Sequence, residues 1–514
     1  MNPVLTFLLF LTVRVASVFI VKTFYVPDEY WQSLEVAHKL VFGYGYLTWE
    51  WLEGIRSYIY PVIIAGLYKI LALIHLDLVE YLVISPRFLQ ALLSSYADYR
   101  FYIWTGKKKW SIFLLLITFF WFYCGSRTLA NTFETALSTI ALSYFPWDKR
   151  DKTSYLWFVG TCCYIRPTAA IVWLPLCLNH LLSTKLSKTE LILKRFVPIG
   201  LIIFSIGIAI DSYFYGKLIL TPWEFIKFNY LLGIGSFYGT HPWHWYFLTG
   251  LPSILGVNYL PFLIGVIQTI RNKEMYIIRK QLLITIFITL ITYSIFQHKE
   301  FRFILILLPL CLYISVDTLV RWSYKASKWA VWVVAIILLI GNAIPNYYLS
   351  LVHQRGTLEV MPFLAEISKV YTDEVNSRAN ILFLMPCHST PYYSHIHQNV
   401  TLRFLTCNPN IHMKQNYIDE AELFYRAPDR WLRSHIPSYP KTAMPTHVVL
   451  FDSLESKISD FLTNYYLIDR IHHTDYADER VGNYVLVFER KNLNTPGDNI
   501  FNKEAEETDD QEAF

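Results

Sequence analysis

The sequence predicts a polytopic α-helical membrane protein that ends in a small α/β domain, and three observations support this prediction. Of the 514 residues, 54% are hydrophobic and only 17% are charged. The apolar residues come in blocks of roughly the twenty residues that a helix needs to cross a bilayer. Beyond about residue 355, these blocks give way to short apolar runs between polar segments. The composition excludes an ordinary soluble protein, and the modest net charge of +5 does not indicate nucleic-acid binding.

The apolar blocks predict about eleven membrane spans. One long block is broken by the dipeptide Arg166-Pro167, so we expect two short spans that meet there. The expected spans lie near 3–21, 58–76, 110–124, 132–147, 154–182 (two spans), 196–212, 247–269, 281–297, 302–320 and 329–348.

The segment 81–105 is a poor candidate for a lipid-facing span. It carries Pro86, Arg87, Asp98 and Arg100, and ionisable side chains facing lipid are costly. We therefore expect an amphipathic or half-inserted helix on the cytosolic side.

The distribution of Lys and Arg predicts the topology. They are concentrated in alternate loops, at 107–109, 148–152, 185–195, 271–280 and 321–328. The positive-inside rule places these loops in the cytosol. The first loop, 24–57, and the C-terminal region are then expected on the opposite side, the lumen of the endoplasmic reticulum. The spans at 1–348 would form one transmembrane module.

The region 349–493 is expected to form a small luminal α/β domain. Apolar runs at 381–385, 447–451 and 484–488 predict buried strands, and 359–371, 414–425 and 453–464 predict helices. The acidic tail 494–514 has little to bury and is expected to be disordered.

Two features of this region suit an oxidising lumen. Asn399 begins the triplet Asn-Val-Thr, an acceptor for N-glycosylation, although such triplets also arise by chance. Cys387 and Cys407 stand apart from the cysteines of the apolar blocks. They are expected either to form a disulfide or to remain two free thiols.

The first luminal loop concentrates acidic residues beside a helical pattern. Pro27 suits the first position of a helix, and Asp28 and Glu29 would lie in its first turn. Apolar residues then recur at helical spacing, as in a helix that lies along the membrane surface: Trp31, Leu34, Ala37 and Val41. The loop is thus either an amphipathic connector with solvated acids or the support of a catalytic carboxylate.

A second charged block, His298-Lys299-Glu300-Phe301-Arg302-Phe303, lies between two strongly apolar spans. Ionisable groups at a membrane boundary need a partner or a water-filled cavity. Lys, Arg and His together suit a phosphate group. Acids on one loop and cations on another, on the same side of the membrane, fit glycosyl transfer from a lipid-linked sugar phosphate.

Five segments in this order resemble the dolichyl-phosphate-mannose-dependent α-mannosyltransferases of the membrane-embedded GT-C type, glycosyltransferase family 22. They are PDEYWQSLEVAHKLVFGYGYLTWEW, SRTLANTFET, IRPTA, YGTHPWHWYF and HKEFRF. The first of them, with LMPCHSTPYYSHIH, most resembles the members that build the glycosylphosphatidylinositol (GPI) anchor. The resemblance covers about residues 10–490. It implies a GT-C bundle, dolichyl phosphate mannose as donor, a GPI precursor as acceptor and an α1,2 linkage for the third mannose.

The resemblance also implies roles for individual residues. Asp28 stands where the family has its catalytic aspartate, with Glu29 as the second candidate. The expected ligands of the donor phosphate are His298, Lys299 and Arg302. The expected contacts with the acceptor or its sugars are Trp31, Glu35, Trp49, Glu50, His241 and His244, although the tryptophans would equally serve as interfacial anchors.

Other assignments stay open at this point. Arg127 and Arg166 would either contact substrate or form a buried pair with Glu134. No cofactor is firmly implied, no metal ligands are assigned, and the sequence does not reveal whether a divalent ion assists. The expected partners are membrane lipids and the two lipid-linked substrates. The rival functions are an N-glycan mannosyltransferase that uses the same donor and a lipid-glycan flippase, for which the sequence lacks an internal repeat.

Overall fold

The structure is a computed structural model that describes residues 2–147, 152–184, 186–272, 277–373, 379–411, 414–436 and 444–491. It divides into two compact units. The first comprises residues up to Leu358 together with Thr390–His397 and Asn408–Gln415. The second comprises Glu359–Ser389, Gln398–Cys407 and the described residues from Asn416 on. Three short stretches expected in the luminal domain therefore belong to the helical unit: 349–358, Thr390–His397 and Asn408–Gln415. The expected tail 494–514 lies outside the described residues.

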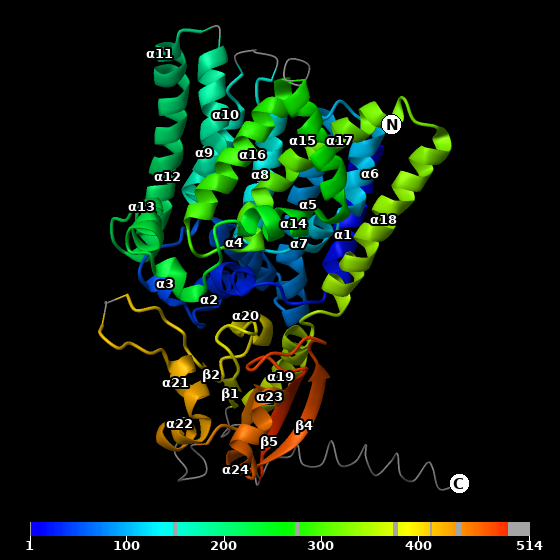
Figure 1. Cartoon of the computed structure of the whole chain (residues 1–514). Helices are drawn as coiled ribbons and strands as arrows, with labels where there is room; N and C mark the ends of the chain where they lie inside the picture. Colours follow the sequence, from blue (N-terminus) through cyan, green and yellow to red (C-terminus); the bar gives the residue numbers. More distant parts are fainter. Residues whose placement is uncertain are drawn as a thin grey trace. The chain divides into compact units, whose positions relative to one another are not determined.

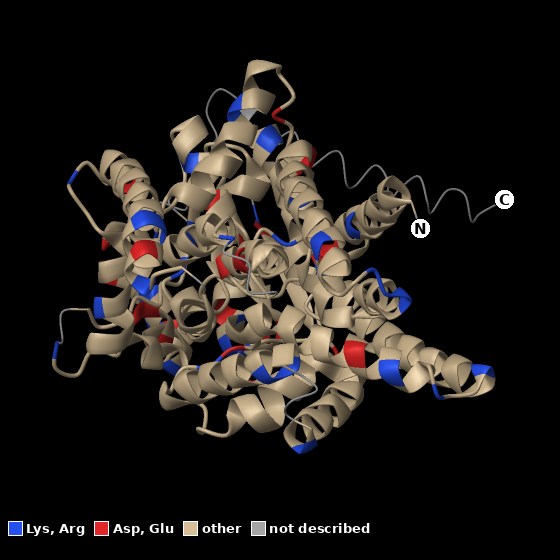
Figure 2. Cartoon of the chain, turned by 90° about the horizontal axis from the view of Figure 1, so that it is seen from above, with Lys and Arg blue, Asp and Glu red and all other residues tan. Residues whose placement is uncertain are grey.

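The first unit is a bundle of helices, most of which contain few charged residues (Figures 1 and 2). Its helices are α1 (Pro3–Ile20), α2 (Glu35–Phe42), α3 (Trp49–Leu52), α4 (Ile59–Leu73), α5 (Val79–Trp104), α6 (Lys109–Ile117), α7 (Phe119–Cys124), α8 (Ala130–Tyr144), α9 (Tyr155–Ile165), α10 (Ala169–Ser183), α11 (Lys188–Leu191), α12 (Val197–Tyr215), α13 (Thr221–Ile226), α14 (Leu251–Leu255), α15 (Tyr259–Arg271), α16 (Ile277–Ile295), α17 (Leu308–Ser323), α18 (Lys328–Leu351) and α20 (Tyr393–Ile396). Helix α19 (Gly356–Asp373) begins in this unit and continues into the second.

Among the described residues, six helical stretches are long and apolar enough to cross a membrane. They are Pro3–Ile20, Lys188–Tyr215, Tyr246–Arg271, Ile277–Ile295, Phe301–Ser323 and Lys328–Tyr371. This confirms a polytopic membrane protein. Most residues in the apolar part of Phe301–Ser323 are buried inside the bundle, whereas few of those in Lys328–Tyr371 are. The charged block HKEFRF thus leads directly into a central helix of the bundle.

Helix α5 covers the segment 81–105, where an amphipathic or half-inserted helix was expected. It runs antiparallel to α1, because Asp98 meets Arg14 (Oδ2–Nε 2.7 Å) while Arg87 donates to the carbonyl of Val21 (2.9 Å). At 26 residues it is long enough to cross a bilayer. Its charged side chains Arg87 and Asp98 contact protein groups inside the bundle.

Helix α4 covers most of the predicted span at 58–76, but at 15 residues it is shorter than the helical stretches that are long enough to cross a membrane. Tyr60 donates to Gln90 and Tyr68 donates to the carbonyl of Leu82, so α4 lies beside the first part of α5.

The second unit contains a five-stranded mixed sheet in the order β2-β1-β3-β5-β4. Strand β1 pairs in parallel with β2 and β3, and β5 pairs antiparallel with β3 and β4. The strands are β1 (Asn380–Leu384), β2 (Thr401–Phe404), β3 (His447–Phe451), β4 (Tyr465–His472) and β5 (Tyr484–Arg490), and the helices after α20 are α21 (Glu420–Arg426), α22 (Pro428–His435), α23 (Asp452–Glu455) and α24 (Ser459–Leu462).

The three predicted strands are confirmed as β1, β3 and β5, and β2 and β4 were missed. Both missed strands form the edges of the sheet, where polar residues replace the continuous apolar runs of central strands. The predicted helix 359–371 is found within α19. The helix expected at 414–425 begins only at Glu420, and 453–464 forms short helical turns.

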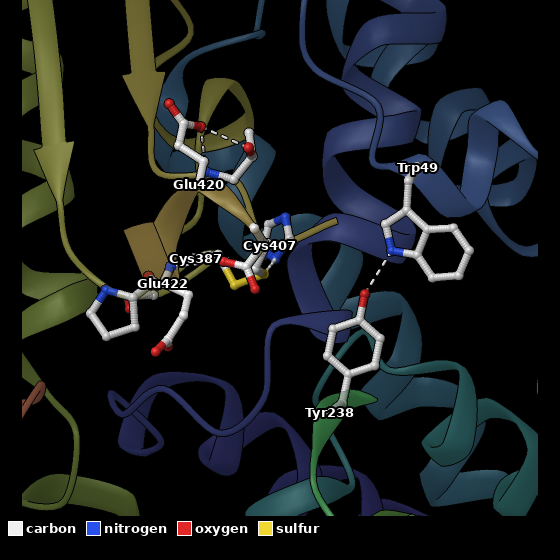
Figure 3. Close-up of a disulfide and its surroundings, with 11 residues drawn as sticks. Trp49, Tyr238, Cys387, Cys407, Glu420 and Glu422 are labelled. Atoms are coloured by element: carbon white, nitrogen blue, oxygen red, sulfur yellow. Dashed lines mark hydrogen bonds between the residues drawn. A yellow bond between two sulfur atoms is a disulfide. The ribbon is translucent and has the colours of Figure 1, made fainter. Parts of the chain in front are cut away.

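Cys387 and Cys407 form a disulfide, with their Cα atoms 5.9 Å apart (Figure 3). It ties the loop after β1 to the segment that follows β2. His388 lies beside the two sulfurs, so the three residues have the proximity of metal ligands. The disulfide occupies both sulfurs, which argues against a metal at this place. Asn399 is exposed immediately before β2, a position open to a glycosylating enzyme.

Candidate active site

The first loop forms the predicted helix, with one irregular turn, but every residue from Tyr30 to His38 is buried, so this part is not the two-faced surface helix that was expected. A π-helical turn (Tyr30–Leu34) leads into α2, and the amides of Tyr30 and Trp31 donate to the carbonyl of Pro27. The helix ends at Gly43, whose φ of +81° is the left-handed cap that glycine adopts without steric cost. Proline at the start and glycine at the end thus fix the segment that presents Asp28.

Asp28 contacts the charged block HKEFRF. Its carboxylate forms an ion pair with Nη1 of Arg302, and the Asp28 side chain remains 17% exposed. Arg302 in turn donates twice to Glu300, with Nε–Oε2 at 2.6 Å and Nη2–Oε1 at 2.5 Å. The predicted base and the predicted phosphate ligand therefore lie side by side.

Glu300 is held as a carboxylate by the cations around it. Burial alone would raise the pKa of Glu300, but Arg302 and His298 outweigh burial and lower it to about 2. His298 Nε2 lies 3.0 Å from Glu300 Oε1. This carboxylate fixes the guanidinium of Arg302 from one side, while Asp28 contacts it from another.

Glu29 points into the protein and away from this cluster. It pairs with Nη1 of Arg127 at 2.7 Å, and both side chains are almost fully buried. Arg127 also donates to the backbone carbonyls of Thr23 (2.8 Å) and Tyr123 (3.0 Å). Glu29, the second candidate for the base, therefore occupies a structural position that ties the first loop to the bundle. The sequence alone does not show that Asp28 is partly exposed while the adjacent Glu29 is buried.

The motifs SRTLANTFET and IRPTA also form buried contacts. Glu134 pairs with Arg166 at 3.0 Å, so the partner of Glu134 is Arg166 and not Arg127. Asn131 donates through Nδ2 to the backbone carbonyl of Arg302 (3.1 Å). This contact holds the start of α8 against the block that carries the cations.

Lys299 lies in the block but points to backbone oxygens. Its ammonium donates to the carbonyls of His241 (2.9 Å) and Phe296, and burial lowers its pKa. His298 Nδ1 lies 3.1 Å from the carbonyl of Gly239. Lys299 and His298 thus connect the loop between α13 and α14 to the block. Of the three predicted phosphate ligands, Arg302 alone contacts the Asp28 carboxylate.

Glu50 belongs to the same group of charges. It accepts from Arg56 (Nη2–Oε1 2.6 Å) and from Gln32 (Nε2–Oε2 3.0 Å). Burial opposes the charge of Arg56, but Glu50 and then Asp28 raise its pKa, which places Arg56 close to both carboxylates. The neighbouring Trp49 donates to the hydroxyl of Tyr238 at 2.7 Å (Figure 3).

Trp31 and Glu35 have partners within the protein and no open surface. Trp31 donates to the carbonyl of Thr390 (3.0 Å). Glu35 accepts from the amides of Tyr392 (2.9 Å) and Ser394 and from the hydroxyl of Ser394 (2.5 Å). Burial raises the pKa of Glu35 to about 7 despite these donors. The prediction that Trp31 and Glu35 contact a sugar is therefore wrong for this structure. Both side chains are buried and bind the segment Thr390–His397.

The two predicted histidines lie in the loop before α14. The His241 ring is exposed and stacks on Trp245 with ring centres 4.8 Å apart. The His244 ring lies edge-on to Trp243, at 5.7 Å. Both occupy an aromatic segment next to the charged block, since Lys299 holds the backbone of His241.

Sequence reasoning gave no site role to two members of the cluster, Arg56 and Tyr238. A single Arg in a loop of five acids carries no local signal of a site. Tyr238 lies in the short 3-10 turn Ile234–Tyr238, and its pairing with Trp49 depends on tertiary contacts that no local pattern reveals.

Known proteins share both the sequence and the fold. Residues 5–397 match the Alg9-like mannosyltransferase family. The chain is 62% identical to GPI mannosyltransferase 3 of Drosophila melanogaster, over 92% of this chain and 84% of that protein. It is 42% identical to GPI alpha-1,2-mannosyltransferase 3 of Homo sapiens, over 94% and 86%.

The fold resembles that of the crystal structure of ArnT from Cupriavidus metallidurans bound to undecaprenyl phosphate. The TM-score is 0.55 at 13% identity, and the match covers 96% of this chain and 99% of ArnT. This likeness supports the GT-C type of bundle predicted from the motifs. The family match over most of the chain carries the identification further: this chain is a mannosyltransferase and belongs to the Alg9-like mannosyltransferase family.

Proposed function

We propose that this enzyme transfers mannose from dolichyl phosphate mannose onto the GPI-anchor precursor, as the third, α1,2-linked mannose, in the lumen of the endoplasmic reticulum. The names of the relatives at 62% and 42% identity support the acceptor and the linkage. The observation that carries the chemistry is the contact between Asp28 and Arg302. It joins a partly exposed carboxylate to a guanidinium suited to phosphate.

In the proposed reaction Asp28 is the general base. Its carboxylate takes the proton of the acceptor hydroxyl as that oxygen bonds to the anomeric carbon of mannose. The bond from this carbon to the phosphate oxygen breaks, and its electron pair leaves with the phosphate. A single displacement turns a β-linked donor into an α-mannoside. The departing phosphate is weakly basic, so the reaction needs no counterpart to the general acid of glycosidases.

Arg302 is proposed to bind the departing phosphate while Glu300 keeps its guanidinium in place. The two hydrogen bonds to Glu300 use Nε and Nη2 and leave Nη1 directed at Asp28. If the phosphate of the sugar donor replaces Asp28 as the partner of Nη1, the Asp28 carboxylate becomes free to accept the proton of the acceptor hydroxyl. The guanidinium of Arg302 is then already in position when negative charge develops on the departing phosphate. Stabilisation by a group fixed in advance is the efficient form of electrostatic catalysis.

Arg302→Lys is expected to impair the use of donor more than the use of acceptor. Lys keeps the charge but loses the planar fork that Glu300 holds. Losing one charge-assisted hydrogen bond costs about 1.5–3 kcal/mol, or roughly ten- to a hundred-fold in donor KM. Steady-state kinetics at varied dolichyl phosphate mannose would measure this. A lower protein level with an unchanged donor KM would show instead that Arg302 only joins the first loop to α17.

The proposed topology has eleven crossings, with the first loop, the charged block and the second unit in the lumen. The crossings would be α1, α5, α6 with α7, α8, α9, α10, α12, α14 with α15, α16, α17 and α18. A C-terminal tag is expected to resist protease in sealed microsomes and to be cleaved once detergent is added. A glycosidase-sensitive mass shift lost in Asn399→Gln would agree with this. Cleavage of the tag in sealed vesicles would refute the orientation.

The lipid-linked glycans of cells that lack this gene would test the function itself. The proposal predicts accumulation of a GPI precursor with two mannoses and normal dolichol-linked glycans. The alternative, an N-glycan mannosyltransferase with the same donor, predicts truncated dolichol-linked glycans and intact GPI precursors. Re-expression of the wild-type chain should restore the three-mannose species in the first case only.

A further inference from the structure

His298 lies between two groups that can only accept hydrogen bonds. Its Nδ1 is 3.1 Å from the carbonyl oxygen of Gly239, and its Nε2 is 3.0 Å from Oε1 of Glu300. A neutral imidazole has one N–H donor and one bare acceptor nitrogen, whereas an imidazolium has two donors. A neutral ring would therefore direct one bare nitrogen at an acceptor oxygen in either tautomer: Nε2 at the Glu300 carboxylate, or Nδ1 at the Gly239 carbonyl. Both contacts are satisfied only if Nδ1 carries a proton and a second proton lies between Nε2 and Glu300.

That proton belongs to the imidazole. Glu300 already accepts two hydrogen bonds from the Arg302 guanidinium, an arrangement that suits an ionised carboxylate. A protonated Glu300 would have to direct its own O–H at His298 and give up acceptor capacity that Arg302 uses. With Glu300 ionised, both ring nitrogens of His298 donate.

The charges in this cluster show why an imidazolium matters for an anionic donor. Asp28, Glu50 and Glu300 contribute three negative charges, and two guanidinium groups contribute two positive ones. Without another cation the group would repel a phosphodiester. The imidazolium of His298 makes these six groups neutral. The ammonium of Lys299, which donates to the backbone carbonyls of His241 and Phe296, then leaves one positive charge to match one phosphodiester.

We propose that His298 is an imidazolium in the donor-free enzyme and acts as a positioning residue, which makes binding of the donor phosphate depend on a proton. The proposal rests on the proposed function, because it assumes a sugar donor linked through phosphate. Protonated His298 offsets the charge of Glu300, so the charge of Arg302 remains available to the phosphate. When His298 loses its proton, Glu300 and Asp28 together neutralise Arg302, and the site loses its attraction for an anion.

The groups facing His298 come from several elements. Glu300 lies two residues after His298 in the same segment, and Arg302 follows at the start of the 3-10 turn Phe301–Leu307. The ring of Tyr238, from the turn Ile234–Tyr238, lies 6.4 Å from that of His298. Asp28 reaches the group through Arg302. Glu300 is the charged group in direct contact with the His298 ring.

The donor KM of the purified full-length enzyme, measured with dolichyl phosphate mannose from about pH 5.5 to 8.5, tests this. For the wild type, the donor KM should be constant at the acidic end and then rise by up to about tenfold per pH unit. The acceptor KM should change much less. In His298→Gln the donor KM should be raised roughly ten- to a hundred-fold at the acidic end and should no longer depend on pH.

A second variant and a control keep the outcomes distinct. His298→Lys retains a positive charge, so its donor KM should stay low at the alkaline end where that of the wild type rises. His75→Gln changes an exposed histidine in the connection after α4 and should reproduce the wild-type profile. A flat wild-type donor KM, or an unchanged pH profile in His298→Gln, would overturn the proposal. A wild-type enzyme that ignores dolichyl phosphate mannose altogether would overturn the proposed function instead.

Discussion

Asp28→Asn is expected to leave the protein folded and inserted but to abolish measurable mannosyl transfer. Asn is nearly isosteric with Asp but cannot accept the proton of the acceptor hydroxyl. Removing a general base typically costs about 10²- to 10⁴-fold in rate. Arg302 keeps both of its hydrogen bonds to Glu300 in this variant, so the block retains its main ion pair. The protein level should therefore remain close to that of the wild type.

The measurement is restoration of GPI-anchored proteins at the surface of cells that lack the gene, together with transfer in microsomes. Glu53→Gln is the matched control, because it neutralises a partly exposed carboxylate in the same loop. That variant should restore surface GPI-anchored proteins fully. Near-normal restoration by Asp28→Asn would remove Asp28 from the role of base. Reduced protein in the Asn variant would point to a structural function for the ion pair with Arg302.

The broad fold followed from composition, because long apolar blocks predict membrane helices and short ones predict strands. Composition does not reveal the partners of charged residues. The sequence alone does not show that Arg14 in α1 pairs with Asp98 in α5. An ion pair inside a bundle makes a charged helix acceptable where contact with lipid would not. Helix α4 is apolar like a span, but it is 15 residues long and packs beside the first part of α5.

The candidate site was predicted by region and not by side chain. The first loop and HKEFRF were expected to meet, and Asp28 and Arg302 do. The pairing of Glu134 with Arg166 was among the stated alternatives, but the roles of Trp31 and Glu35 could not be foreseen, since both looked equally suited to a sugar and are used for packing. A carboxylate in an interfacial helix has several possible partners. Only the folded chain determines which of them comes within hydrogen-bonding distance.

Glu29→Gln is expected to lower the stability of the protein, whereas Asp28→Asn lowers its activity, although the two acids are adjacent. Glu29 and Arg127 are both almost completely buried and lie 2.7 Å apart. Neutralising one member of such a pair leaves the other charge buried without compensation, which typically costs about 3–5 kcal/mol. The variant should therefore unfold at lower temperature and accumulate less in cells. Thermal unfolding of the detergent-purified protein and the steady-state protein level measure both effects.

Two comparisons decide whether Glu29 is structural or catalytic. The double variant Glu29→Leu with Arg127→Met removes both charges and should recover part of the stability lost in Glu29→Gln, because replacing a whole buried pair is far less costly than breaking it. Glu53→Gln makes the same chemical change at a partly exposed position and should unfold like the wild type. If Glu29→Gln were instead stable but inactive, the buried pair would not hold the loop, and Glu29 would become a candidate for the base. Loss of stability in Glu29→Gln, with loss of activity but not stability in Asp28→Asn, would assign anchoring to Glu29 and the chemistry to Asp28.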